Sequence, residues 1–126
     1  MLSLPPAVRI FVAAAPTSMH LSFDRLAALV HEVMGEDPLS GHLFAFRNRS
    51  GDKVKILCWD RSGFCLWYKR LERGVFHLPP TGEARVEIDA ADLLLLLDGI
   101  ELTHTRRRPR FALPVGAGRT STANIL

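Results

Sequence analysis

The sequence has few of the features that identify common classes of protein chemistry. It contains only two cysteines in 126 residues, Cys58 and Cys65, which is too few for the disulfide framework of a small secreted domain. The two could form a disulfide if they face each other, but an intracellular protein would keep them reduced. Cys65 with a remote histidine could also be a nucleophile, yet cysteines inside strands are more often inert. We expect two buried thiols.

Long uncharged apolar runs are also absent, so no segment of the sequence is expected to span a bilayer. Residues 1–18 resemble a signal peptide only in part, because Arg9 follows two prolines and the apolar stretch Ile10–Ala15 is short. We expect a cytoplasmic protein with no membrane partner.

Motifs of catalytic and metal sites are missing as well. There is no P-loop, no dinucleotide-binding glycine pattern and no nucleophile elbow. The five histidines show no ligand spacing to one another or to the cysteines. A two-metal nuclease needs several carboxylates in one pocket, which nothing in the order of the aspartates implies: Asp24, Asp52, Asp60, Asp89, Asp92 and Asp98. We expect no metal, no cofactor and no enzymatic activity.

Acidic residues are absent from the end of the chain. Residues 103–126 carry five arginines and no acid, whereas residues 1–102 carry eleven basic and thirteen acidic side chains. Small and polar residues without a period predict that this tail is largely disordered. We expect one folded domain at 1–102 and a basic tail at 103–126. Arginines on a flexible arm bind phosphates by charge, with little sequence selectivity.

The most informative stretch is residues 42–76, which hold both tryptophans, the only tyrosine and eight of the sixteen Lys/Arg residues. Two Ser-Gly turn signals divide it into three runs rich in aromatic and β-branched residues, which predicts a three-stranded antiparallel meander. The turns predict a register in which Trp59 faces Phe64, Lys55 faces Tyr68 and Cys58 faces Cys65. The same register predicts further pairs: Leu57 with Leu66, Lys53 with Arg70, Ile56 with Trp67, Phe44 with Leu57, Phe46 with Lys55, and Ala45 with Ile56.

The flanking segments predict the rest of the fold. Strands are expected at 8–13, 75–78 and 84–88. A helix should follow Ser22 as N-cap and end at Gly35 in a left-handed cap, with an apolar stripe of Phe23, Leu26, Ala27, Val30, Val33 and Met34. A second, short helix should follow the N-cap Asp89, with Asp92 at the capping-box position, and end at Gly99. The prediction is an α+β fold, with an antiparallel sheet of about five strands, one long helix and one short helix.

The short helix contains five consecutive leucines at 93–97, so it is apolar around most of its circumference. Such a helix is either buried or pressed against a partner. We expect one side to lie in the core and leave open whether the other side meets another protein.

Three segments resemble a known family. They are LPPAVRIFVA at Leu4–Ala13, SFDRLAALV at Ser22–Val30, and GHLFAFRNRSGDKVKILCWDRSGFCLWYKRLERGVF at Gly41–Phe76. They resemble the accessory proteins encoded by the second reading frame of insertion sequences of the sixty-six class. These are often called TnpB, a name shared with unrelated RNA-guided nucleases. The most specific pattern is WD-x-x-G-x-C-L-x-YKRLERG, carried by Trp59, Asp60, Gly63, Cys65, Tyr68, Lys69, Arg70, Leu71, Glu72, Arg73 and Gly74.

The resemblance runs from about Leu4 to Arg110 and implies a role in DNA transposition, beside a larger transposase of the Asp-Asp-Glu type. No catalytic residue is implied, because the biochemical task of the family is not firmly assigned. The sequence departs from the family at residues 18–21, where Ser-Met-His-Leu replaces an acidic-Met-Arg-Lys run. This change removes two positive charges from a loop that could contact phosphate.

Our leading hypothesis is a non-catalytic transposition factor whose partners are DNA and the element's transposase. Trp59, Tyr68 or Phe64 could stack on an exposed base, although core packing is the more common role of tryptophans. The residues expected to contact DNA phosphates are Arg47, Arg49, Lys53, Lys55, Lys69, Arg70, Arg73, Arg106, Arg107, Arg108 and Arg110.

Three alternatives remain open from the sequence. The basic groups could simply be a solvated sheet edge and a tail. The protein could be an adaptor that docks on the transposase through its leucine-rich helix. It could also be a nuclease, with Asp60 as a carboxylate to test.

Overall fold

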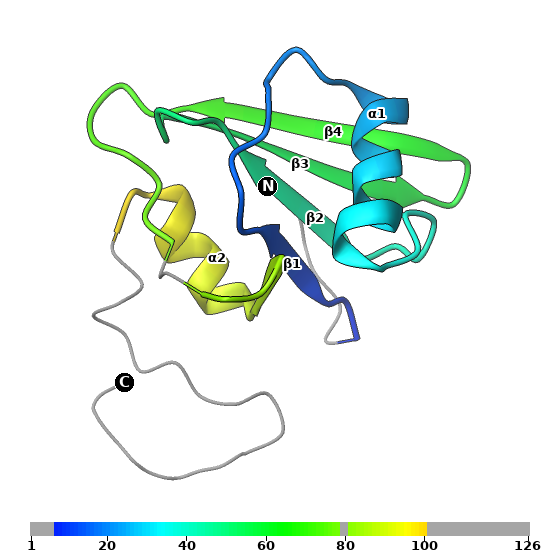
Figure 1. The fold of residues 1–126 in the computed structure, drawn as a ribbon. Coiled ribbons are helices and arrows are strands. Elements are labelled where there is room, and N and C mark those ends of the chain that lie inside the picture. Colours follow the sequence, from blue (N-terminus) through cyan, green and yellow to red (C-terminus); the bar gives the residue numbers. More distant parts are fainter. Residues whose placement is uncertain (1–6, 79–80, 101–126) are drawn as a thin grey trace, which may run out of the picture.

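The structure, a computed structural model, describes residues 7–78 and 81–100. Its strands form one five-stranded sheet, and Figure 1 shows how the sheet and helices are arranged. Helix α1 covers one face of the sheet and helix α2 covers the other. The elements in chain order are β1 (Ile10–Ala13), α1 (Phe23–Leu29), η1 (Val30–Met34), β2 (Leu43–Arg47), β3 (Lys53–Asp60), β4 (Gly63–Arg70), β5 (Arg85–Ile88) and α2 (Ala90–Leu97). The predicted α+β class is confirmed.

The strand order is β4-β3-β2-β1-β5, and all neighbours are antiparallel except β1 and β2, which are parallel. We expected an antiparallel sheet throughout. The parallel pair arises because the helical segment at 23–34 connects β1 to β2, and such a crossover returns the chain in its original direction. The sheet is therefore mixed, with β1 paired on both sides.

The central meander has the predicted register at every pair. Phe44 lies opposite Leu57, Lys55 lies opposite Tyr68, and Cys58 lies opposite Cys65. The β3–β4 turn consists of two residues, because Asp60 and Gly63 are themselves paired. Alternation along the strands then assigns each side chain of the meander to either the α1 face or the α2 face.

The long helix spans the predicted range but changes geometry midway, because Val30–Met34 form a π-helical turn after α1. Gly35 provides the predicted left-handed cap, with φ of 67°. Ser22 occupies the N-cap position, but its side chain makes no capping hydrogen bond. Phe23 and Val33 are exposed, so including them in the buried stripe was wrong. Leu26, Val30 and Met34 are the buried residues of the predicted stripe.

Helix α2 begins as predicted, because the Asp89 carboxylate accepts a hydrogen bond from the backbone N–H of Asp92 at 2.8 Å. Leu93, Leu96 and Leu97 are buried in the core on the α2 face, and Leu94 is 55% exposed. The leucine run therefore serves mainly as core, since only one of its sides faces solvent.

The prediction of a strand at 75–78 is wrong. Residues 71–78 form a loop that is held to the β2–β3 turn instead of pairing with the sheet. The backbone N–H of Leu71 donates to Asp52 O, and that of Phe76 donates to Gly51 O, both at 2.7 Å. Gly51 has φ of 81°, and an added Cβ would lie 3.2 Å from Val75 Cβ. The close approach of loop and turn therefore depends on a glycine at this position.

The predicted tail at 103–126 lies outside the described residues, so its disorder stays a prediction. Within the described parts of the chain, no helix is both long enough and apolar enough to cross a membrane.

Candidate nucleic-acid interface

The α1 face of the meander changes from aromatic to basic along its length. Trp59 pairs with Phe64 at the β3–β4 turn, whereas Lys53 pairs with Arg70 at the other end. Lys55 and Tyr68 form the pair next to that basic end. The observed register therefore grades this face from aromatic at the β3–β4 turn to basic at the other end.

Two further arginines lie at the same end of the sheet. Arg49 is in the β2–β3 turn and Arg73 is in the 71–78 loop, which the two hydrogen bonds described above hold together. Both side chains are exposed, and neither forms an ion pair with a described residue. We call Arg49, Lys53, Arg70 and Arg73 the basic end.

Two carboxylates partly neutralise the basic end. Arg70 Nε donates to Glu72 Oε2 at 3.1 Å, and Lys53 Nζ lies 3.9 Å from Asp52 Oδ2. The pKa of Asp52 is lowered, first by the hydrogen bond from Asn48 and then by that from Ser50, so this carboxylate is charged at neutral pH. Arg49 and Arg73 keep the cluster positive.

Lys55 has a structural position that differs from its predicted role. Lys55 is only 7% exposed, and its Nζ donates to the backbone oxygens of Met19 and Leu21 at 2.7 and 2.8 Å. The ammonium therefore fixes the loop that precedes α1. A lysine with these partners is not presented to a phosphate.

Arg47 and Lys69 lie on the α2 face, apart from the other cations of the predicted set. Arg47 Nη2 donates to Ala14 O at 2.9 Å. Lys69 Nζ donates to Leu97 O at 2.8 Å, at the end of α2, and lies 4.0 Å from a carboxylate oxygen of Asp98. These two cations hold the chain together and do not converge with the basic end. Arg106, Arg107, Arg108 and Arg110 lie outside the described residues.

The aromatic candidates have different environments. Trp67 packs against the core on the α2 face, and Phe64 packs against the core on the α1 face. Trp59 contacts Phe64 edge-on, with ring centroids 5.1 Å apart. Tyr68 is 51% exposed and, together with Lys53, Arg70 and Glu72, lines a shallow hollow of about 340 Å³. Of the three rings expected to stack on a base, Tyr68 is the one beside the basic end.

The remaining family-motif residues cluster around the β3–β4 hairpin and the loop after it. Asp60 and Gly63 flank the hairpin turn, and Gly74 has φ of 76° in the loop. Cys58 and Cys65 are free thiols. Cys58 is partly buried, and Cys65 on the outer strand of the sheet is exposed, so the expectation of two buried thiols was wrong. Burial raises the pKa of the Cys58 thiol, with smaller contributions from Cys65 and Asp60.

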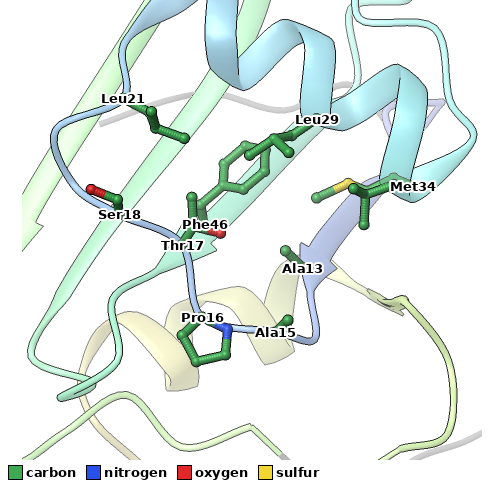
Figure 2. Close-up of a pocket in the computed structure, with 10 residues that line it drawn as sticks. Ala13, Ala15, Pro16, Thr17, Ser18, Leu21, Leu29, Met34 and Phe46 are labelled. Atoms are coloured by element: carbon green, nitrogen blue, oxygen red, sulfur yellow. The ribbon is translucent and has the colours of Figure 1, made fainter.

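Among residues 7–78 and 81–100, no three His, Cys, Asp or Glu side chains lie close enough together to hold a metal ion. An apolar pocket of about 230 Å³ lies between the loop before α1, the helical segment and strands β1 and β2. Figure 2 shows its lining, which includes Pro16, Leu21 and Phe46 and contains no ionisable side chain.

Several contacts that organise this region could not be found by sequence reasoning. The loop before α1 is held by Lys55 and by a hydrogen bond from the Thr17 N–H to Arg47 O at 2.8 Å. Arg85 on β5 donates to Met34 O at 2.8 Å and forms an ion pair with Glu36. These partners are far apart in the chain, and no local pattern links them.

Comparison with known proteins gives consistent matches. The family model described as IS66 Orf2 like protein matches residues 8–107. The uncharacterized protein y4hO of Sinorhizobium fredii (strain NBRC 101917 / NGR234) is 42% identical over 97 residues, which cover 77% of this chain and 84% of that protein. The uncharacterized protein y4jC of the same strain is 33% identical over 102 residues, covering 81% and 87% of the two chains. No solved structure shows a significant match.

Proposed function

This chain belongs to the IS66 Orf2-like family, whose members have an accessory role in transposition, and from that premise we propose that it is a non-catalytic factor that binds DNA phosphates. The basic end would make the ordered contacts, and the arginines at 106–108 and 110 would add contacts without sequence selectivity. The transposase of the same element would be its protein partner.

The observation that carries this proposal is the position of Arg49, Lys53, Arg70 and Arg73, which all lie at one end of the sheet. The two exposed arginines have no ion-pair partner among the described residues, and the fold places both on adjoining loops. Exposed guanidinium groups without an ion-pair partner can bind phosphate through paired hydrogen bonds and through their charge. Asp89 has a structural task away from this end, as the N-cap of α2.

We expect the double variant Arg49→Ala, Arg73→Ala to bind duplex DNA more weakly and with less dependence on salt. Each lost phosphate contact should reduce the magnitude of the slope of log K against log salt by about 0.9. The slope of the double variant should therefore be smaller in magnitude by about 1.8. Fluorescence anisotropy titrations at several salt concentrations measure this slope.

A matched control removes two charges that do not belong to the basic end. Arg25→Ala is in α1, and Arg61→Asn is in the β3–β4 turn, where φ of 47° suits asparagine. This pair should leave the slope nearly unchanged. Equal losses in both double variants, or no binding by the unsubstituted chain at low salt, would contradict the proposed interface.

The second candidate is an adaptor that docks on the transposase, and one observation favours it. Leu94 of α2 and Ile100 just after it are about half exposed, next to leucines that are buried. We expect Leu94→Asp to lose the transposase in a pull-down after nuclease treatment if this surface is the contact. Retention of the transposase by this variant after nuclease treatment would contradict a contact through Leu94. Loss of the transposase when the unsubstituted chain is treated with nuclease would favour bridging through DNA.

A further inference from the structure

Tyr68 is an exposed aromatic ring in a basic setting. It lies on β4, the outer strand of the sheet, with Arg70 two residues further on the same face and Lys53 on the neighbouring strand. These three residues and Glu72 line one hollow. Half of the tyrosine is open to solvent, although a ring of this size usually buries most of its surface.

The ring is held in place from one side. Lys55 Nζ lies 4.9 Å from the ring centroid, and two backbone carbonyls fix that ammonium. A cation against an aromatic ring is a favourable contact, and the cross-strand pairing of Lys55 with Tyr68 sets its geometry. The tyrosine is therefore a preorganised surface that loses little entropy when a flat group stacks on it.

The groups around the ring suit a nucleotide. Stacking on an aromatic side chain uses the face of a base, while Lys53 and the free guanidinium nitrogens of Arg70 can contact its phosphates. Arg70 Nε donates a hydrogen bond to Glu72 Oε2 at 3.1 Å. This bond orients the guanidinium group and leaves its Nη groups available. A base in a duplex has no exposed face, so this combination discriminates between unpaired and paired DNA.

We propose that Tyr68, flanked by Lys53 and Arg70, is a stacking site for an unpaired base of single-stranded DNA. This inference rests on the proposed DNA-binding function and specifies its substrate: the ends of an element in a single-stranded or distorted form. Duplex DNA would still contact Arg49 and Arg73, but it would not use the tyrosine.

The test compares two labelled ligands, a thymidine oligonucleotide of about 20 nucleotides and a duplex of the same length, in anisotropy titrations with the full chain. The unsubstituted chain should prefer the single strand. Tyr68→Leu should weaken single-strand binding by about 5- to 150-fold, the usual cost of losing one stacked base, and leave duplex binding unchanged. Tyr68→Phe should keep the preference, because it retains the ring.

Phe23→Leu is the matched control, because Phe23 is also an exposed aromatic residue but lies on α1. It should change neither affinity. A second measurement needs no substitution: an oligonucleotide containing 5-iododeoxyuridine, irradiated with the full chain, should give a covalent adduct that peptide mapping places at Tyr68.

Three outcomes would overturn the inference. They are equal binding of single strand and duplex, an equal loss of both in Tyr68→Leu, and an adduct that maps away from Tyr68. In each case phosphate binding by the basic end would survive. Failure of both ligands to bind at low salt would instead remove the proposed function, and the inference with it.

Discussion

Replacing Lys55 by methionine should lower the free energy of unfolding by about 3 kcal/mol, because it leaves two partly buried carbonyl oxygens without their charged donor. Methionine keeps most of the length of the side chain, so the loss reports the hydrogen bonds to Met19 O and Leu21 O. The cation contact with Tyr68 is lost as well. Urea denaturation followed by circular dichroism measures the change.

Lys53→Met is the matched control for this experiment. Lys53 lies on the same strand and the same face, two residues earlier, and its ion pair with Asp52 is partly exposed. Ion pairs of this kind contribute about 0–1 kcal/mol, so the control should lose little stability. It should weaken DNA binding instead. Similar urea midpoints of unfolding for the two variants would contradict the inference that Lys55 fixes the loop that precedes α1.

Leu96→Ala should destabilise the fold by about 2–5 kcal/mol, since the truncation leaves a cavity between α2 and the sheet. Leu96 is only 1% exposed and belongs to the core on the α2 face. Leu94→Ala provides the comparison within the same run of leucines. Its side chain is 55% exposed, so its loss should be within about 0.5 kcal/mol. Thermal or urea unfolding of both variants measures the difference.

A small loss in Leu96→Ala would mean that α2 does not complete the core on its face of the sheet. A large loss in Leu94→Ala would mean that this side of the helix is covered, either by the chain itself or by a second molecule. The two leucines therefore also report on the adaptor hypothesis. A partner that covers Leu94 should raise the stability of the unsubstituted protein when it is added.

The meander was predictable because the residues that determine its turns and its register lie close together in the sequence. Two Ser-Gly turns separate short strands, and alternation along those strands leaves only one register consistent with the apolar pattern. Asp89 and Gly35 marked the ends of helices for the same reason, since each acts on backbone groups within one turn. This register correctly placed Tyr68 next to the pair of Lys53 and Arg70.

Long-range contacts limited the rest of the prediction. Lys55 looked like one cation among several, because nothing near it in the sequence shows that Met19 O and Leu21 O would accept its hydrogen bonds. The 75–78 segment has strand composition, but hydrogen bonds to the β2–β3 turn satisfy its backbone. The parallel pairing of β1 with β2 depends on how the helical crossover packs, which composition does not specify.

The position of β1 also affects the order of events during synthesis on the ribosome. β1 is made first, yet it needs β2 on one side and β5 on the other. When the nascent chain has emerged only as far as β4, the meander and α1 can associate, but one side of β1 and the face later covered by α2 are still bare. Contacts of this sequence separation are slow to form. A chain truncated before β5 would therefore expose an apolar edge suited to pairing with other chains.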